Sequence, residues 1–74
     1  MITGRINSGD NSELYILDDQ RQKNVNLHSG QYLYLSVNES WIPVVISFSP
    51  NSRRWVFQNL EDLDVNGQKV MMKN

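Results

Sequence analysis

The sequence contains no cysteine, a single histidine and no long apolar run. Without cysteine, neither a disulfide framework nor a thiolate metal site can supplement a small hydrophobic core. No segment approaches the roughly 20 apolar residues of a membrane-spanning helix. The first ten residues also lack an apolar stretch of signal-peptide length. We therefore expect a cytoplasmic protein that does not associate with membranes.

Neither sign of charge predominates, because seven basic residues oppose eight acidic ones and the net charge is −1. The two signs are interspersed, so no global field draws the chain toward nucleic acid or an anionic membrane. A length of 74 residues suits one domain. Residues 1–74 are therefore predicted to form a single domain. About 60% of its unfolded surface would be buried on folding, which predicts modest stability.

Residues 41–60 read as two strands joined by a turn. Two runs rich in β-branched and aromatic residues flank a stretch of Pro, Asn and Ser, which is typical of a β-hairpin. In the first run, Ile42, Val44, Ile46 and Phe48 alternate with a mixed row of side chains. An apolar row opposite a mixed row predicts a half-buried antiparallel strand, with these four side chains in the core.

Similar alternation predicts further short strands, and no segment has the spacing of an amphipathic helix. The predicted strands are residues 2–6, 14–17, 32–37, 41–49, 55–60 and 68–73. Residues 18–26 are predicted to be a long solvated loop, and Gly4 to mark a bulge or a close backbone approach. Asn66-Gly67 favours a type I′ turn. The predicted fold is all-β, a small SH3-like barrel of five or six short antiparallel strands.

Several core and turn residues resemble a known pattern. They are Leu27-x-Ser29-Gly30, Leu33-x-Leu35-x-Val37, the run from Trp41 to Ile46, Arg54-Trp55-Val56-Phe57 and Gly67-x-x-Val70. Together they resemble a family of small uncharacterised domains from Gram-positive bacteria and their phages. The resemblance implies an SH3-like barrel, no assigned activity and no catalytic residue. Val45 stands where that family commonly has arginine or glycine, so the outer face here is more apolar.

The strand phase has a consequence for the large side chains that alternate with the core. Tyr32 and Tyr34 should point outward, together with Trp41 and Val45 on the next strand, and Tyr15 could join them. A small monomer rarely exposes so many large apolar groups, and Tyr and Trp dominate binding hot spots. Alternatively, the loop at residues 18–26 or the first strand covers these aromatics, or Trp41 packs at the end of the barrel.

These outward residues predict a non-catalytic interaction module that binds a protein partner. Arg53, Arg54 and Glu39 are predicted to lie at its rim and to set orientation. The partner could be a host enzyme, a defence complex or a second copy of the chain. The phage-linked resemblance favours a small accessory protein that regulates such a host target. No cofactor is expected.

The alternative function is nucleic-acid binding by Trp55 with Arg53 and Arg54. A base stacked on the indole and a phosphate held by arginine are typical of sequence-tolerant single-strand binders. Neutralising several phosphates takes several cations, and this chain has Glu61, Asp62 and Asp64 close by in sequence. Nucleic acid is therefore the less favoured partner.

Metal and catalytic chemistry find little support in the sequence. Asp62-x-Asp64-x-Asn66-Gly67 matches the first half of a calcium loop, but Lys73 stands where the closing glutamate is required. An acidic turn is the simpler interpretation, and no metal site is predicted. His28 has no recognisable nucleophile or carboxylate partner, and the adjacent Asp18 and Asp19 should point apart. We therefore do not expect an enzyme.

Overall fold

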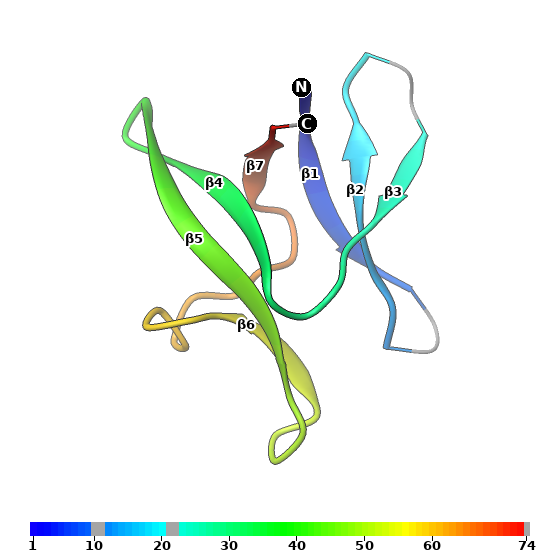
Figure 1. The fold of residues 1–74 in the computed structure, drawn as a ribbon, viewed down its shortest axis with the longest axis vertical. Coiled ribbons are helices and arrows are strands. Elements are labelled where there is room, and N and C mark those ends of the chain that lie inside the picture. The colour runs from blue at the N-terminus through cyan, green and yellow to red at the C-terminus, as the bar shows by residue number, and fades with distance from the viewer. Residues whose placement is uncertain (10–11, 21–22, 74) are drawn as a thin grey trace.

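The computed structural model describes residues 1–9, 12–20 and 23–73, and these form one antiparallel sheet of seven strands (Figure 1). The strands are β1 (Ile2–Ser8), β2 (Leu14–Asp18), β3 (Asn24–Asn26), β4 (Gln31–Val37), β5 (Ser40–Ser49), β6 (Arg54–Phe57) and β7 (Lys69–Met72). The order across the sheet is β3-β2-β1-β7-β4-β5-β6. The described residues include no helix long and apolar enough to cross a bilayer.

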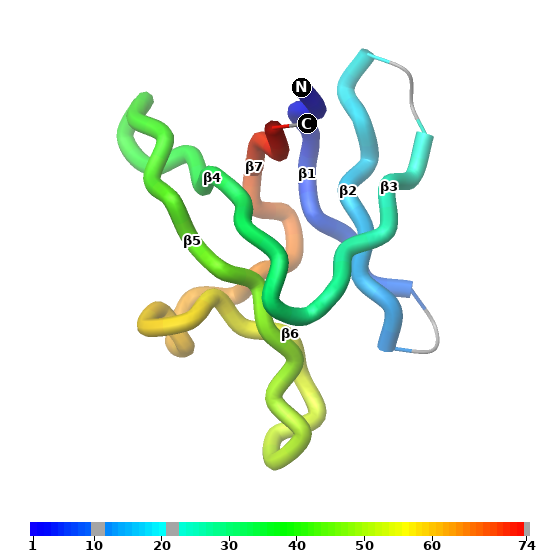
Figure 2. Tube along the Cα trace, viewed as in Figure 1, coloured from blue at the N-terminus to red at the C-terminus, as the bar shows by residue number. Residues whose placement is uncertain are grey.

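The sheet curls into a small barrel, which confirms the predicted all-β fold class (Figures 1 and 2). Its first and last strands, β3 and β6, share no ladder among the described residues, so the barrel is partly open. A side-chain bond crosses this seam: the Trp55 indole N–H donates to the Ser12 carbonyl oxygen at 2.7 Å. The strands nearest the two ends of the sequence, β1 and β7, pair with each other. Their ladder runs from the pair Ile2–Met72 to the pair Arg5–Lys69.

The core fills the concave side of the sheet. Its fully buried large side chains are Ile6, Leu14, Ile16, Leu33, Leu35, Ile46, Phe57 and Val70. These residues come from six of the seven strands, and each is an inward member of its strand's alternation. Val25, Trp55 and Met72 pack partly buried against them. The predicted inward phase is therefore correct for most of the strands, but Phe48, which was predicted in the core, is only half-buried and contacts the Trp55 ring.

Three local expectations were wrong. The segment predicted as a loop at residues 18–26 contains β3, which pairs with β2 from Tyr15–Asn26 to Leu17–Asn24. A three-residue strand of Asn-Val-Asn is too short to show alternation. The strand count is therefore seven rather than five or six. Arg21 and Gln22 of that segment lie outside the described residues, as do Asp10 and Asn11 between β1 and β2.

The third correction concerns the Asn66-Gly67 turn, which is not type I′. Only Gly67 has a positive φ, +79°, whereas a type I′ turn needs positive φ at both central residues. The Gln68 amide donates to the Val65 carbonyl, so Gly67 takes the third position, as in a type II turn. The turn leads the chain into β7 beside β1 rather than joining two paired strands.

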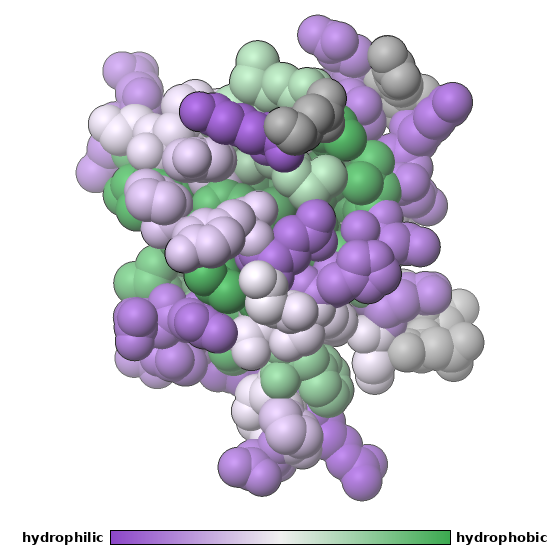
Figure 3. Space-filling model, in the orientation of Figure 1, coloured by the Kyte–Doolittle hydropathy of each residue, from purple (hydrophilic) through white to green (hydrophobic). Residues whose placement is uncertain are grey.

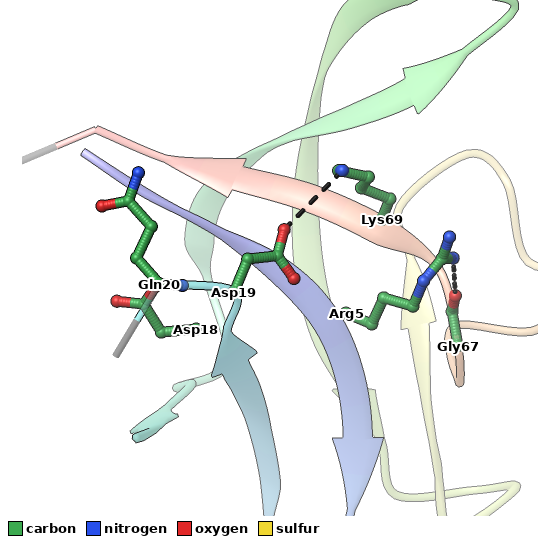
Figure 4. Close-up of polar contacts among 6 residues, drawn as sticks. All are labelled: Arg5, Asp18, Asp19, Gln20, Gly67 and Lys69. Atoms are coloured by element: carbon green, nitrogen blue, oxygen red, sulfur yellow. Dashed lines mark hydrogen bonds and ion pairs between the residues drawn. The ribbon is translucent and has the colours of Figure 1, made fainter. Parts of the chain in front are cut away.

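Polar contacts hold the β1–β7 side of the barrel (Figure 4). Asp19 and Lys69 form an ion pair at 3.6 Å, and the Arg5 guanidinium donates to the Gly67 carbonyl at 2.8 Å. Asp18 is buried, and its Oδ1 accepts the Gln20 amide. The two adjacent aspartates therefore point apart as expected, although Asp18 holds a turn rather than facing solvent.

The β4–β5 hairpin has a two-residue turn that contains no glycine. Asn38 and Glu39 have φ of 49° and 67°, which is the type I′ pattern, and Val37 pairs with Ser40 across it. A two-residue hairpin fixes the register of the strands it joins. The predicted short connection at this point is confirmed, and its conformation determines which side chains of β4 and β5 face one another.

We predict that Gly4→Ala destabilises the protein by more than about 2 kcal/mol. A Cβ at Gly4 would lie 1.9 Å from the Leu17 carbonyl oxygen, so β1 and β2 would have to separate. Gly67→Ala is the control, because nothing lies within 4 Å of a Cβ there and only the positive φ opposes it, at about 1 kcal/mol. Urea unfolding measures both, and equal losses would contradict the close approach at Gly4.

We also predict that Glu39→Gly raises the free energy of unfolding by about 0.5–1 kcal/mol. Glycine removes the steric cost of the left-handed conformation at this position. It also raises the conformational entropy of the unfolded chain, which cancels part of the stabilisation. Thermal unfolding should show an increase of a few degrees for a domain of this size. An unchanged or lower melting temperature would argue against the type I′ turn.

Candidate functional site

The register of β4 and β5 brings the predicted outward residues together. Tyr32 pairs with Val45, Tyr34 with Pro43, and Ser36 with Trp41. Directly opposed residues of antiparallel strands project to the same side of the sheet, here the convex side. We call the set Tyr32, Tyr34, Trp41, Pro43 and Val45 the aromatic face. The prediction that these side chains share one face is confirmed.

These three residue pairs are also of the non-hydrogen-bonded type, in which the side chains lie closer together. The Gln58 amide donates to the Val45 carbonyl, so the backbone polar groups of Val45 point toward β6. Because this direction repeats at every second residue, the backbone polar groups of Pro43 and Trp41 also point away from β4. Opposed residues without mutual backbone hydrogen bonds bring their side chains nearer, at about 4.5 Å between Cα atoms. Tyr34 and Pro43 therefore form one contiguous surface.

The aromatic face is open to solvent. Tyr32 is 72% exposed and Trp41 is 41% exposed, while Tyr34 and Val45 are half-buried. The described part of the 18–26 segment does not cover them, and Trp41 does not pack into the core. Among the described residues, neither the 18–26 segment nor β1 hides Tyr32 or Trp41 from solvent.

Tyr34 lies at the centre of this surface and has neighbours on both strands beside it. Met71 of β7 pairs with Tyr34 on the side opposite Pro43, so its side chain projects to the same convex side and is buried beside Tyr34. The Lys73 ammonium lies 5.0 Å from the Tyr34 ring centroid, a cation–π contact that orients the ring. Lys73 therefore contributes a positive charge at the rim, and Glu39 lies exposed in the turn near Trp41.

Tyr15, Arg53 and Arg54 do not join the aromatic face. Tyr15 points outward from β2, three strand spacings from β4, or about 14 Å across the sheet. Arg54 pairs with Ser49, four residues along β5 from Val45, or about 13 Å. Its guanidinium is committed to the Glu61 carbonyl at 2.7 Å. The predicted rim was therefore wrong for the two arginines.

Arg53, Arg54 and Trp55 instead line a polar pocket of about 490 Å³ at the open seam of the barrel. Trp55 is half-buried, and its ring meets Phe48 edge to face at 5.4 Å between centroids. With its N–H bonded to Ser12 as well, its ring is held by the fold. Asp62 and Asp64 line the same pocket. This geometry gives no support to base stacking on Trp55, and nucleic-acid binding stays a prediction.

The calcium-like motif is a turn. The Asp64 Oδ1 accepts the Asn66 amide, and the Asn66 side-chain oxygen accepts the Ser8 hydroxyl. One side-chain oxygen of Asp64 and that of Asn66 are thus used within the protein. Across the described residues, no three or more His, Cys, Asp or Glu side chains gather as a metal site would require. His28 is exposed in its turn, as expected.

Sequence reasoning missed a second apolar surface. Ile42 was predicted to fill the core, yet it is 40% exposed, because it lies on the inward side of β5 beyond the end of the closed barrel. With Val37, Leu60 and Leu63 it lines a groove of about 890 Å³ between the β4–β5 hairpin and the 58–66 segment. Leu60 and Leu63 in a turn of otherwise polar residues were the available signal.

Comparisons with protein-family models, with curated proteins and with solved structures find no match to this chain. The resemblance to small domains of Gram-positive bacteria and their phages therefore stays a prediction.

We predict that calcium at millimolar concentration leaves the melting temperature unchanged, in the wild type and in Asp64→Ala alike. The motif lacks its closing carboxylate, and Asp64 Oδ1 and Asn66 Oδ1 already accept hydrogen bonds within the protein. Differential scanning fluorimetry with calcium and with magnesium as the matched control measures this. A rise specific to calcium that Asp64→Ala abolishes would contradict the assignment of this segment as a plain turn.

Proposed function

We propose that this protein is a non-catalytic, cytoplasmic interaction module that binds a protein partner through the aromatic face. One observation carries the proposal: Tyr32, Tyr34 and Trp41 lie on one side of a hydrogen-bonded hairpin, with Tyr32 72% and Trp41 41% exposed. Single exposed apolar residues are ordinary on a protein surface, whereas adjacent large ones mark interaction sites.

The chemistry of the aromatic face favours a protein over a small molecule or a nucleic acid. The face lies on the convex side of the sheet, while small-molecule sites are concave. Lys73 and Glu39, of opposite sign, adjoin the face, and Lys69, which projects to the same side from β7, is paired with Asp19. Phosphate recognition needs several cations in one place. Tyrosine and tryptophan with a polar rim match the composition of protein–protein interfaces.

The mechanism is burial of a preformed surface. Seven residue pairs hold β4 against β5, so the aromatic side chains start from a rigid backbone, and little ordering opposes binding. Each ring would lose water to the partner, and the Tyr and Trp side chains would act as anchors. Lys73 and Glu39, of opposite sign, would orient the partner and contribute to association rate more than to affinity.

The resemblance to phage-linked domains supports a narrower version of the proposal. In it the protein is a small accessory protein of a phage or mobile element. Its aromatic face occupies a host enzyme or a defence complex and regulates it. Binding to a second copy is the alternative occupant of the same surface.

We predict that Trp41→Ala combined with Tyr32→Ala lowers recovery of the partner at least about thirtyfold, since each hot-spot side chain contributes roughly 2 kcal/mol. The measurement is quantitative mass spectrometry of proteins captured from host lysate, confirmed with the purified partner. Leu17→Ala is the matched control, because Leu17 is as exposed as Trp41 but lies on β2.

The control should retain every partner that the wild type captures. Analytical ultracentrifugation of the same variants tests self-association, which the double substitution should abolish if a second copy is the occupant. A partner that the double variant still binds, or that Leu17→Ala loses equally, would remove the aromatic face from the account. Loss of a single-stranded oligonucleotide in Arg53→Glu with Arg54→Glu would favour the nucleic-acid alternative.

A further inference from the structure

The groove beside the β4–β5 hairpin is a second surface, on the other side of β5 from Trp41. Its apolar walls are Val37 and Ile42 from the hairpin and Leu60 and Leu63 from the segment after β6, each between 36% and 42% exposed. Figure 3 shows apolar surface on the β4–β5 side of the molecule, bordered by hydrophilic side chains. Leu35 lies at its floor and is fully buried.

The groove exists because β6 is shorter than β5. The ladder between them runs only from Ile46–Phe57 to Ser49–Arg54, and β4 alone pairs with the half of β5 from Ser40 to Val44. After Phe57 the chain turns away, with the Leu60 amide bonded to the Phe57 carbonyl and the Leu63 amide to the Leu60 carbonyl. These two turn bonds place Leu60 and Leu63 opposite Ile42 instead of continuing the sheet.

The open edge of β5 does not favour an added strand. The backbone polar groups of Trp41 and Pro43 point to this edge, and proline has no N–H to donate. Proline in a strand is tolerated at such an edge and weakens pairing with another strand. Recognition in the groove would therefore depend on side chains, as when an amphipathic helix inserts its apolar residues into a groove.

The charge of the groove restricts the occupant further. Its charged lining residues are Glu61 and Asp62. Among the described residues the only ion pair joins Lys69 to Asp19, so neither carboxylate has a cation in direct contact. The Glu61 carboxylate accepts the Asn59 amide, and Arg54 reaches only the Glu61 backbone carbonyl. The rim is thus acidic beside an apolar floor.

We infer that this groove docks an amphipathic helix of a partner protein whose apolar side chains are flanked by lysine or arginine. Two apolar side chains one turn apart would pack between Ile42 and Leu63, and the basic residues would pair with Glu61 and Asp62. A second copy placed groove to groove would oppose acid to acid, and anionic lipid or nucleic acid would be repelled. The inference concerns a different face from the proposed function and does not depend on it.

The test uses a peptide of about 14 residues of leucine and lysine with leucine at helical spacing, and a matched leucine–glutamate peptide. Titrations into the isotope-labelled, full-length protein are followed by backbone and methyl NMR shifts. The leucine–lysine peptide should shift Val37, Ile42, Leu60 and Leu63, and bind at least about tenfold tighter than its acidic counterpart. Its affinity should fall as salt is raised.

Matched variants locate the site. Ile42→Ser and Leu63→Ser should each weaken the leucine–lysine peptide about tenfold, while Leu17→Ser, of similar exposure, should change it less than twofold. Glu61→Gln with Asp62→Asn keeps the shape of the groove and should remove both the preference for the basic peptide and the salt dependence. That double variant decides the matter even if a serine variant fails to fold.

Three results would overturn the inference. They are equal affinity for the two peptides, shifts confined to Tyr32, Tyr34 and Trp41 on the aromatic face, and no binding of the basic peptide at millimolar concentration. The second result would leave the proposed function standing. Failure of the aromatic-face experiment with intact peptide binding in the groove would overturn the proposed function and leave this inference standing.

Discussion

The pairing of β4 with β5 is the constraint on which the rest of this structure depends. A type I′ turn at Asn38 and Glu39 fixes the register, and seven residue pairs follow from it. A shift by one residue would put Leu33 opposite Pro43 or Val45, so the apolar residues of β4 and β5 would lie on opposite sides of the hairpin and could not both fill the core. Burial of the apolar face therefore stabilises the arrangement that exposes the aromatic one.

The unequal length of β5 and its partners gives this small barrel two distinct surfaces. β5 has ten residues, and β6 covers only its second half. Near the β4–β5 turn, Trp41 projects to the convex side, while Ile42 projects into a groove that the barrel does not close. Pro43 follows Ile42 and removes a donor from the open edge, which limits uncontrolled strand pairing beside these exposed apolar side chains.

Much of this arrangement was predictable because strand alternation is a local property. The inward phase of Val44, Ile46, Leu33 and Leu35 followed from a period of two, and the outward phase of Tyr32 and Trp41 followed with it. Gly4 was predicted to mark a bulge or a close approach, and the backbone of Leu17 does come near it. These features need no knowledge of distant contacts.

The remaining features depend on where strands end and which strands become neighbours, and alternation does not contain that information. Ile42 has the phase of a core residue but lies past the end of the barrel. Tyr15 faces outward as predicted, yet the sheet order inserts β1 and β7 between it and Tyr34. Trp55 was a candidate for base stacking from its sequence context, but its indole N–H donates to the Ser12 carbonyl across the seam, a contact between residues far apart in the chain.

The register of β4 and β5 can be measured directly by interstrand Hα–Hα nuclear Overhauser effects in solution. Residue pairs without mutual backbone hydrogen bonds bring their Hα atoms into close contact. The account predicts strong cross-peaks between Tyr32 and Val45, between Tyr34 and Pro43, and between Ser36 and Trp41. Cross-peaks displaced by one residue, such as Tyr34 with Val44, would place Tyr34 on the same side of the hairpin as a core residue and contradict the account.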